Sequence, residues 1–219
     1  MNFSAEDVFH PNLMKGGVPF VSQQTLTYQN QPELRIDQNN LISTGALSST
    51  SANSFGGEIG INWRNYLVQG GYYTINNNQL LPPGKPSPVL SFGGGYVEGG
   101  WVITGEPIRY SVGDAAFARP RVTNPFSLGG GIGAWELAGR YSVMNLNSNV
   151  IDGVAESVTG GVFGGYQQVY GAALSWYPND RVRLVLQFQY VNVNKLDPTG
   201  KIQIGQRFET LAGRVQVAF

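Results

Sequence analysis

Apolar and polar residues alternate with a period of two along much of this chain, in segments of about ten residues. In the clearest segment the apolar face carries Trp135, Leu137, Gly139, Tyr141 and Val143, and the polar face carries Glu136, Ala138, Arg140 and Ser142. Successive side chains of a β-strand point to opposite faces, so this pattern predicts an amphipathic strand. A helical period is sustained nowhere, and the sequence therefore predicts an all-β fold.

Residues 170–190 predict an antiparallel hairpin. Its second arm places Val182, Leu184, Leu186, Phe188 and Tyr190 opposite Arg181, Arg183, Gln187 and Gln189, with Val185 as the single apolar residue on the polar side. The first arm, 170–176, reaches the second through Pro178-Asn179-Asp180. Proline, asparagine and aspartate in so short a connection favour a tight turn between two antiparallel strands.

The same template predicts nine or ten strands in all. The candidate ranges are 33–37, 41–49, 55–63, 66–75, 90–98, 101–110, 135–143, 170–176, 182–190 and 205–219. Irregular stretches are expected at 76–88, 111–131 and 146–165, and residues 1–30 are expected to form an irregular segment ahead of a β-barrel domain at 31–219. Strands of this length, joined by short turns and long loops in alternation, are typical of an antiparallel transmembrane β-barrel.

The amino-acid composition agrees with an all-β fold and argues against a nucleic-acid partner, disulfides, thiolate metal sites and a transmembrane helix. The chain has 30 glycines, 11 tyrosines, 11 phenylalanines and 4 tryptophans, as expected of a β-rich protein with many turns. Its 14 basic and 14 acidic residues balance, so no nucleic-acid partner is indicated. No cysteine is present, which excludes disulfides and thiolate metal sites. No run of 18 apolar residues occurs, so strands would have to make any membrane crossing.

Aromatic residues and the two chain ends bear on a membrane location. Aromatic pairs at strand ends, Trp63/Tyr66, Tyr96/Trp101 and Trp176/Tyr177, predict interfacial girdles, although Trp and Tyr also favour strands in general. Phe219 ends an alternating strand, which resembles the signal by which the barrel-assembly machinery recognises and inserts outer-membrane barrels. Residues 1–7 lack the features of a secretory signal, so a mature chain or part of a longer precursor is expected.

Short motifs occur in a particular order and spacing: Pro32-Glu33-Leu34-Arg35, Ser43-Thr44-Gly45, Thr104-Gly105-Glu106 with Arg109-Tyr110, GAWELAGRYS at 133–142, Leu146-Asn147, SWYPN at 175–179 with Val182-Arg183, and RVQVAF at 214–219. Together they resemble the C-terminal half of the phosphate-selective porin O/P family. The resemblance implies a sixteen-stranded homotrimeric barrel in a Gram-negative outer membrane, passing phosphate or other small anions without a cofactor. This chain would supply a little over half of such a barrel, so a fragment of a longer porin is expected. Gly71 departs from similar sequences, which tend to have an acid there.

Arginine side chains are the candidates for binding anions in such a pore. Arg140, Arg183 and Arg214 lie on polar strand faces, and Arg109 lies near a strand end, as do Arg35 and Arg181. Arg119 and Arg121 form a basic element beside Phe117 that could reach the pore entrance. The planar guanidinium binds phosphate oxygens in pairs, which suits this role. Alternatively, the wall arginines pair with the acids Glu58, Glu106 and Glu136 and leave little net field, and the basic element is an exposed turn.

The sequence provides few candidate residues for an enzymatic function. His10 is the only histidine, which argues against a Ser-His-Asp triad or a multi-histidine metal site. Glu106 and Glu136 resemble a glycosidase carboxylate pair in type only, and a wall role accounts for them. The glycine runs at 93–95 and 129–131 precede no predicted helix, so a phosphate-binding loop is not supported. The sequence predicts a passive porin, with a soluble β-rich carbohydrate-binding or adhesion module as the alternative.

Overall fold

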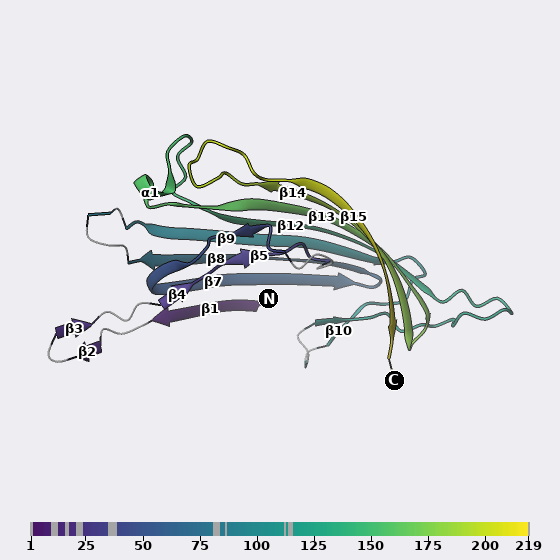
Figure 1. The fold of residues 1–219 in the computed structure, drawn as a ribbon. Coiled ribbons are helices and arrows are strands. Elements are labelled where there is room, and N and C mark those ends of the chain that lie inside the picture. The colour runs from purple at the N-terminus through teal and green to yellow at the C-terminus, as the bar shows by residue number, and fades with distance from the viewer. Residues whose placement is uncertain are drawn as a thin grey trace.

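The computed structural model describes residues 2–9, 13–15, 18–20, 24–34, 39–80, 84–85, 87–111, 113 and 116–218. The main element of the described residues is one curved antiparallel sheet with loops at both ends (Figure 1). Its strands lie side by side in the order β1 (Asn2–Phe9), β7 (Leu47–Trp63), β8 (Tyr66–Gln79), β9 (Val89–Val102), β12 (Ala134–Ser148), β13 (Val162–Asn179), β14 (Val182–Asn194) and β15 (Arg207–Val217), and β4 (Gln24–Leu26) also pairs with β7.

The remaining elements are short and lie outside this sheet. Three two-stranded pairs join β2 (Leu13–Lys15) to β3 (Val18–Phe20), β5 (Gln29–Asn30) to β6 (Ile42–Ser43), and β10 (Arg109–Ser111) to β11 (Ala116–Ala118). A single helical turn, α1 (Glu156–Thr159), lies between β12 and β13. Among the residues that the structure describes, no helix has the length and hydropathy needed to cross a membrane.

Connections of different length emerge from the two ends of the sheet. At one end, here called the turn rim, residues 64–65 join β7 to β8 and residues 180–181 join β13 to β14. At the opposite loop rim, the connections 80–88, 149–161 and 195–206 are all longer. The segment 103–133 is the exception, because it is long and leaves from the turn rim. The predicted alternation of short and long connections is therefore confirmed apart from this segment.

The turn at 180–181 forms because Asn179 closes it with its side chain. Asn179 Oδ1 accepts hydrogen bonds from the backbone N–H groups of Arg181 (2.9 Å) and Val182 (3.0 Å). Asparagine favours such turns because its side chain can satisfy backbone donors that the strands leave unpaired. The predicted hairpin is confirmed, and its register brings Leu174 opposite Leu186.

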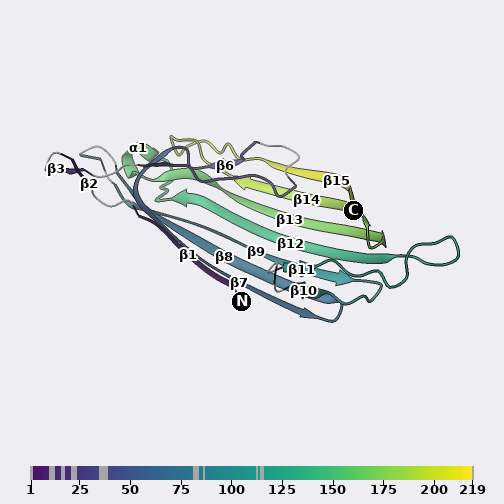
Figure 2. The same ribbon diagram turned by 90° about the horizontal axis from the view of Figure 1, so that it is seen from below.

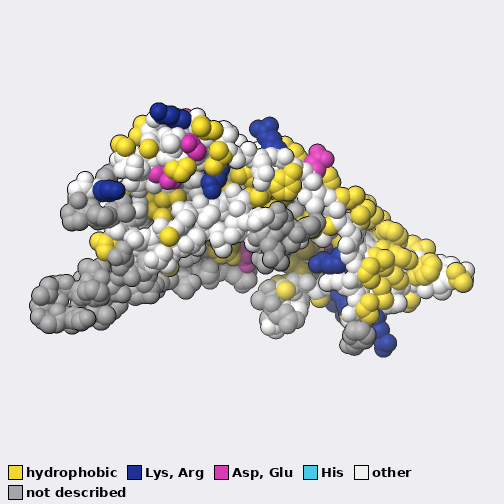
Figure 3. Space-filling view, in the orientation of Figure 1, with side chains coloured by type: hydrophobic (Ala, Val, Ile, Leu, Met, Phe, Trp, Pro, Cys, Tyr) yellow, Lys and Arg dark blue, Asp and Glu magenta, His cyan; other side chains and the backbone are white. Residues whose placement is uncertain are grey.

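The curvature of the sheet distinguishes a concave face from a convex face (Figure 2). Large hydrophobic side chains, each 37–68% exposed, occupy the convex face: Phe55, Ile59, Ile61, Val68, Val97, Leu137, Leu174, Leu186, Leu211 and Val215. Figure 3 shows hydrophobic side chains gathered on the outer surface near the turn rim. Polar and charged side chains such as Arg140 and Gln187 alternate with them on the concave face. The two-faced strands that the sequence predicts are thus confirmed.

A hydrophobic core lies on the concave side near the loop rim, beneath the segment that joins β4 to β7. Ile42 and Leu47, from this segment and the start of β7, are buried against residues of the sheet. The sheet residues in this core are Leu90, Phe92, Leu146, Val162, Val169, Val191 and Val193. Burial of these side chains fixes the described residues 27–34 and 39–46 inside the curve of the sheet, because each buried aliphatic side chain contributes about 1.5–3 kcal/mol.

Several predicted element boundaries are wrong. Residues 90–98 and 101–110 were expected to be separate strands, but β9 runs unbroken from Val89 to Val102 through Gly99-Gly100. Leu67 on one side and Ala138 on the other pair with Gly100 and carry the ladder through the glycines. The range 41–49 divides between β6 and β7. Glu33 and Leu34 lie in a turn rather than a strand, and 35–37 fall outside the described residues.

The N-terminal segment 1–30, expected to be irregular, contributes strands to the sheet. Asn2–Phe9 forms β1 and pairs along its whole length with β7, from Asn2 opposite Glu58 to Phe9 opposite Ser51. The alternation fails locally at Asp7-Val8 in the sequence, and the neighbouring strand supplies the order that the local pattern lacks. The all-β antiparallel prediction is confirmed, and the described sheet stays open between its edge strands β1 and β15.

Candidate functional site

Arg140 lies on the concave face between two acids. It belongs to β12, and the register places it opposite Glu98 of β9. Its Nη1 is 2.5 Å from Glu98 Oε2, and its Nε is 2.8 Å from Glu33 Oε1. The guanidinium also lies over the ring of Tyr96, 4.1 Å from the ring centroid. Two carboxylates and an aromatic face therefore surround this cation, and the three ionised groups carry a formal charge of −1 together.

A second charged group is centred on Glu136, nearer the turn rim. Arg183 Nη2 lies 3.7 Å from Glu136 Oε2, and the buried Tyr177 donates a hydrogen bond of 2.6 Å from its hydroxyl to the same oxygen. Arg183 Nη2 also donates to Ser175 Oγ at 3.0 Å. This arrangement holds the Arg183 guanidinium against the wall, with one acid compensating its charge.

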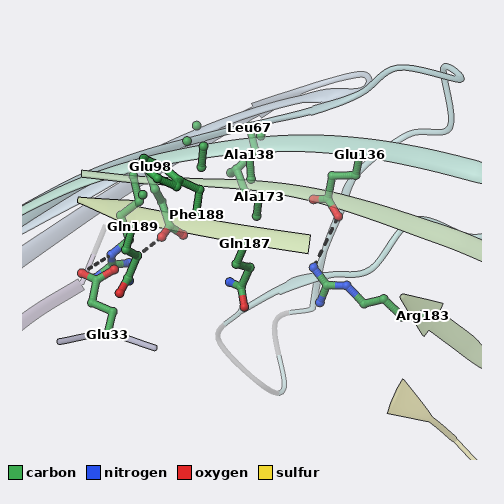
Figure 4. Close-up of a pocket in the computed structure, with 16 residues that line it drawn as sticks. Glu33, Leu67, Glu98, Glu136, Ala138, Ala173, Arg183, Gln187, Phe188 and Gln189 are labelled. Carbon is green, nitrogen blue, oxygen red and sulfur yellow. Dashed lines mark hydrogen bonds and ion pairs between the residues drawn. The ribbon is translucent and has the colours of Figure 1, made fainter. Parts of the chain in front are cut away.

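The two charged groups line one hollow on the concave face, with a volume of about 260 Å³. Figure 4 shows Glu33 and Glu98 at one side of this hollow and the joined pair of Glu136 and Arg183 at the other, with Gln187 between them. Small residues form much of its floor: Gly99, Gly100, Ala138, Gly139, Gly171, Ala172 and Ala173. Their small side chains leave room for the long polar side chains. Charged side chains therefore form the sides of the hollow, and backbone atoms form much of its floor.

One segment folds over the concave face from the loop rim. Within residues 27–46, the backbone N–H of Leu34 donates to Gln189 Oε1 at 3.3 Å, and Glu33 reaches Arg140. The backbone carbonyl of Gln31 accepts a hydrogen bond of 3.5 Å from Gln167 Nε2. These polar contacts continue the anchoring that begins at the hydrophobic core, and they bring an acid from a distant part of the chain into the hollow.

A second segment, within 103–133, folds over the concave face from the turn rim. Phe117 of β11 lies against Gly60 of β7, so closely that a Cβ on this glycine would be 2.9 Å from the ring. Asn62 Nδ2 donates a 2.9 Å hydrogen bond to the carbonyl of Ile108. Arg119 lines a hollow of about 430 Å³ between this segment and the sheet, together with Glu58 and Glu98. Within the basic element, Arg119 therefore lies toward the concave side although its side chain is exposed, whereas Arg121 is exposed and lines no part of this hollow.

The remaining predicted acids have defined contacts. Glu58 Oε1 accepts a hydrogen bond of 2.9 Å from the hydroxyl of Tyr96. It lies opposite Gly71, where a Cβ would be 2.8 Å from Glu58 Cγ, so the missing side chain at residue 71 makes room for Glu58. Glu106 is buried within 103–133 and accepts hydrogen bonds from the hydroxyls of Thr104 and Thr123. Its contacts shape this segment.

The predicted arginines differ in where the structure places them relative to the concave face and its hollows. Arg140, Arg183 and Arg214 lie on the concave face as the alternation predicts, Arg214 opposite Val185. Arg109 and Arg121 are exposed and line neither of the two hollows above. Whether any of these residues binds an anion stays a prediction. Phe219, His10 and Arg35 lie outside the described residues.

Wall arginines were expected to pair with Glu58, Glu106 or Glu136. One of the two observed arginine pairings involves an expected acid, and the other involves different acids. Arg183 pairs with Glu136 as expected, whereas Arg140 pairs with Glu98 and Glu33, which the sequence did not single out. Glu98 could have been found, because it shares the period-two face of its strand and lies on the strand next to Arg140. Glu33 could not, because a contact across 107 positions leaves no local signal.

Aromatic side chains gather on the convex face at the turn rim. Tyr66 stacks between Trp63, at 6.4 Å, and Trp101, at 6.0 Å, measured between ring centroids. Trp135 and Trp176 stack at 5.6 Å on neighbouring strands. Two other members of the predicted girdle are corrected, because Tyr96 and Tyr177 point to the concave face, where they donate to Glu58 and Glu136. Their alternation places them there, opposite to their neighbours Trp101 and Trp176.

Comparison with known protein families gives a match to one of them. The family described as "Phosphate-selective porin O and P" matches residues 7–219. An uncharacterized protein of Caulobacter vibrioides is 32% identical over 129 residues, which are 59% of this chain and 23% of that protein. The chain thus matches about a quarter of the length of this relative.

Proposed function

The chain belongs to the phosphate-selective porin O and P family, and on that premise we propose that its concave face lines part of a water-filled pore through which small anions diffuse passively. The family comprises outer-membrane porins and not enzymes. A soluble carbohydrate-binding or adhesion module, the alternative from the sequence, does not account for this membership. Transport in the proposed pore needs no cofactor, since the solute moves down its own gradient.

The observation that carries the proposal is the row of arginines on the concave face. Arg140 and Arg183 line the hollow between the two charged groups, and Arg119 reaches inward from 103–133. A guanidinium can replace part of the hydration shell of an anion while leaving it free to depart, which conduction requires. The convex face, which carries exposed aliphatic side chains, suits contact with acyl chains.

The charges on this wall are nearly balanced, which limits the preference for anions. Arg140 and Arg183 are each compensated by acids, whereas Arg119 and Arg214 form no ion pair within the described ranges. We therefore assign most of the anion preference to Arg119 and Arg214. Phosphate is the favoured solute because of the family description, and chloride and pyrophosphate are the competitors.

The wider assembly is also part of the proposal. The family and the apolar convex face support insertion into the outer membrane of a Gram-negative bacterium, with lipid and the barrel-assembly machinery as partners. A homotrimer and a sixteen-stranded barrel follow from the earlier resemblance. In such a barrel β1 and β15 would each pair with a further strand, because an unpaired edge is costly in lipid.

Reversal potentials in planar lipid bilayers test the proposal. Under a potassium chloride gradient, Arg214→Ala and Arg119→Ala are expected to lower the chloride-to-potassium permeability ratio about two- to fivefold each. Arg140→Ala and Arg183→Ala are expected to lower it as well, because the first leaves Glu33 and Glu98 uncompensated and the second leaves Glu136 uncompensated. The matched control is Arg207→Ala, since Arg207 lies on the convex face beside Asn192. An unchanged ratio in Arg119→Ala and Arg214→Ala would contradict the assignment of the anion preference to these two residues.

A further inference from the structure

Residues 122–135 form a stretch of fourteen residues without a charge between Arg121 and Glu136. Within it, Phe126 is 51% exposed, Leu128 is 101% exposed and Ile132 is 56% exposed. The tip of this loop projects past the ends of β12 and β13 at the turn rim (Figure 1, Figure 2). Large apolar side chains that stay half to fully exposed on an uncharged loop indicate a partner of low polarity.

This loop packs on the convex side of the rim, where the aromatic cluster lies. The ring of Phe126 meets Trp176 edge to face at 5.3 Å, and Trp176 Nε1 donates a 2.9 Å hydrogen bond to the carbonyl of Ile132. Trp176 stacks in turn on Trp135. The segment 103–133 therefore has two parts, with Phe117 over the concave face and Phe126 joined to the apolar surface outside.

The loop is pre-organised, and much of its backbone is satisfied internally. The N–H of Ser127 donates to the carbonyl of Gly131 at 3.1 Å, and the N–H of Gly130 returns to the carbonyl of Ser127 at 3.2 Å. Gly131 N–H donates to Ser127 Oγ, and Phe126 N–H to the carbonyl of Pro178. A backbone whose donors are already bonded enters a medium of low polarity at less cost than an open loop.

We propose that residues 125–132 are an anchor that inserts the side chains of Phe126 and Leu128 into the interfacial layer of the membrane at the turn rim. The inference rests on the proposed function, which places lipid against the convex face. Tryptophan and tyrosine mark the interface, so the Trp135/Trp176 pair fixes the depth of the loop. Leu128 is two residues from Phe126 and thus at most about 7 Å beyond it along the chain. The headgroup layer on each side of the hydrocarbon is about 5–8 Å thick, so Leu128 stays within it.

Single cysteines carrying an environment-sensitive fluorophore test this anchor, since the chain has no cysteine of its own. The labelled protein is inserted in vesicles of phosphatidylethanolamine and phosphatidylglycerol that contain phosphatidylcholine brominated near the headgroup end of its acyl chains. A label at Leu128→Cys is expected to emit at shorter wavelength and to be quenched at least half as much as one at Leu186→Cys on the convex face. The aqueous control is Arg181→Cys, in the neighbouring turn at the same rim, which is expected to stay unquenched.

The possible outcomes distinguish a failure of the proposed anchor from a failure of the proposed pore. Quenching at residue 186 without quenching at residue 128 would overturn the anchor and leave the lipid-facing wall intact. Absence of quenching at both positions would overturn the lipid-facing wall, and the proposed function with it. Self-quenching at residue 128 that depends on the fraction of labelled chains, without an effect of brominated lipid, would show that a second copy covers the loop and would also overturn the anchor.

Discussion

Arg140 and Glu33 form an ion pair across 107 positions of sequence, with Nε 2.8 Å from Oε1. Through this contact, the segment that folds in from the loop rim is joined to the wall of the sheet, where Glu98 holds the same guanidinium from the other side. Both side chains of the pair keep about a third of their surface exposed. A pair of this exposure contributes about 0.2–1 kcal/mol to stability, so its larger effect is on the field inside the hollow.

Removing the acids around Arg140 should increase the preference for anions. In Glu33→Gln combined with Glu98→Gln, the guanidinium keeps hydrogen-bond partners but loses the compensating charges. We expect the chloride-to-potassium permeability ratio to rise about two- to tenfold, as measured by reversal potential in planar bilayers at low salt.

The matched control for this pair is Glu209→Gln, which removes an acid from the convex face opposite Tyr190. Its permeability ratio should equal that of the parent chain. A fall in the ratio of the double variant would mean that these acids do not oppose the passage of anions.

Gly165→Ala should loosen the segment that covers the loop rim. Gly165 has a φ of +105°, and a Cβ there would lie 2.6 Å from Cγ2 of the buried Ile42. Backbone strain and overpacking together are expected to lower the free energy of unfolding by about 2–4 kcal/mol. Denaturant unfolding from vesicles measures this, and single-channel conductance should rise as residues 27–46 leave the concave face. Gly213→Ala is the control, because its added Cβ meets nothing within 4 Å.

Tyr177→Phe should destabilise the second charged group. The hydroxyl of Tyr177 is buried and donates to Glu136 at 2.6 Å, so its removal takes a hydrogen bond from a carboxylate that has little water around it. We expect a loss of about 1–3 kcal/mol in the free energy of unfolding, again by denaturant titration in vesicles. Tyr170→Phe, on the exposed convex face, should cost less than half as much. Equal losses in the two variants would remove the hydrogen bond from the explanation.

The loop 195–206 should lose local order as the pH falls. The hydroxyl of Thr199 and the backbone N–H groups of Ile202 and Lys201 bond to Asp197 and hold its pKa below the ordinary value of 3.8. A carboxyl with a lowered pKa in the folded loop stabilises that loop above its unfolded pKa. The contribution is lost as the pH falls through the lower folded value.

Hydrogen exchange at Lys201 and Ile202, compared between the parent chain and Asp197→Asn, measures this effect. At a pH of about 6 the variant should exchange faster, and the difference between the two chains should shrink as the pH falls below 3.8, the ordinary pKa of the carboxyl. Equal exchange at the higher pH would show that the carboxylate does not hold the loop.

The alternation of residues predicted the strands and their two faces because side-chain direction in a strand is a local property with a period of two. It placed Leu137 outside and Arg140 inside, and likewise Leu186 and Arg183, in agreement with the structure. The pattern failed where order comes from a neighbouring strand. Gly99-Gly100 reads as a break in the sequence, yet Leu67 and Ala138 carry β9 through it.

The sequence by itself therefore determined an all-β chain with one apolar and one polar face, and it contained the motifs of the porin family. Only the tertiary structure decided which charges meet. Arg140 pairs with Glu33 because residues 27–34 and 39–46 lie over a hydrophobic core, and Phe117 reaches Gly60 because the described part of 103–133 folds inward from the turn rim. Contacts of this kind depend on the curvature of the sheet and on chain reversals far away in sequence, and no local spacing of residues encodes either.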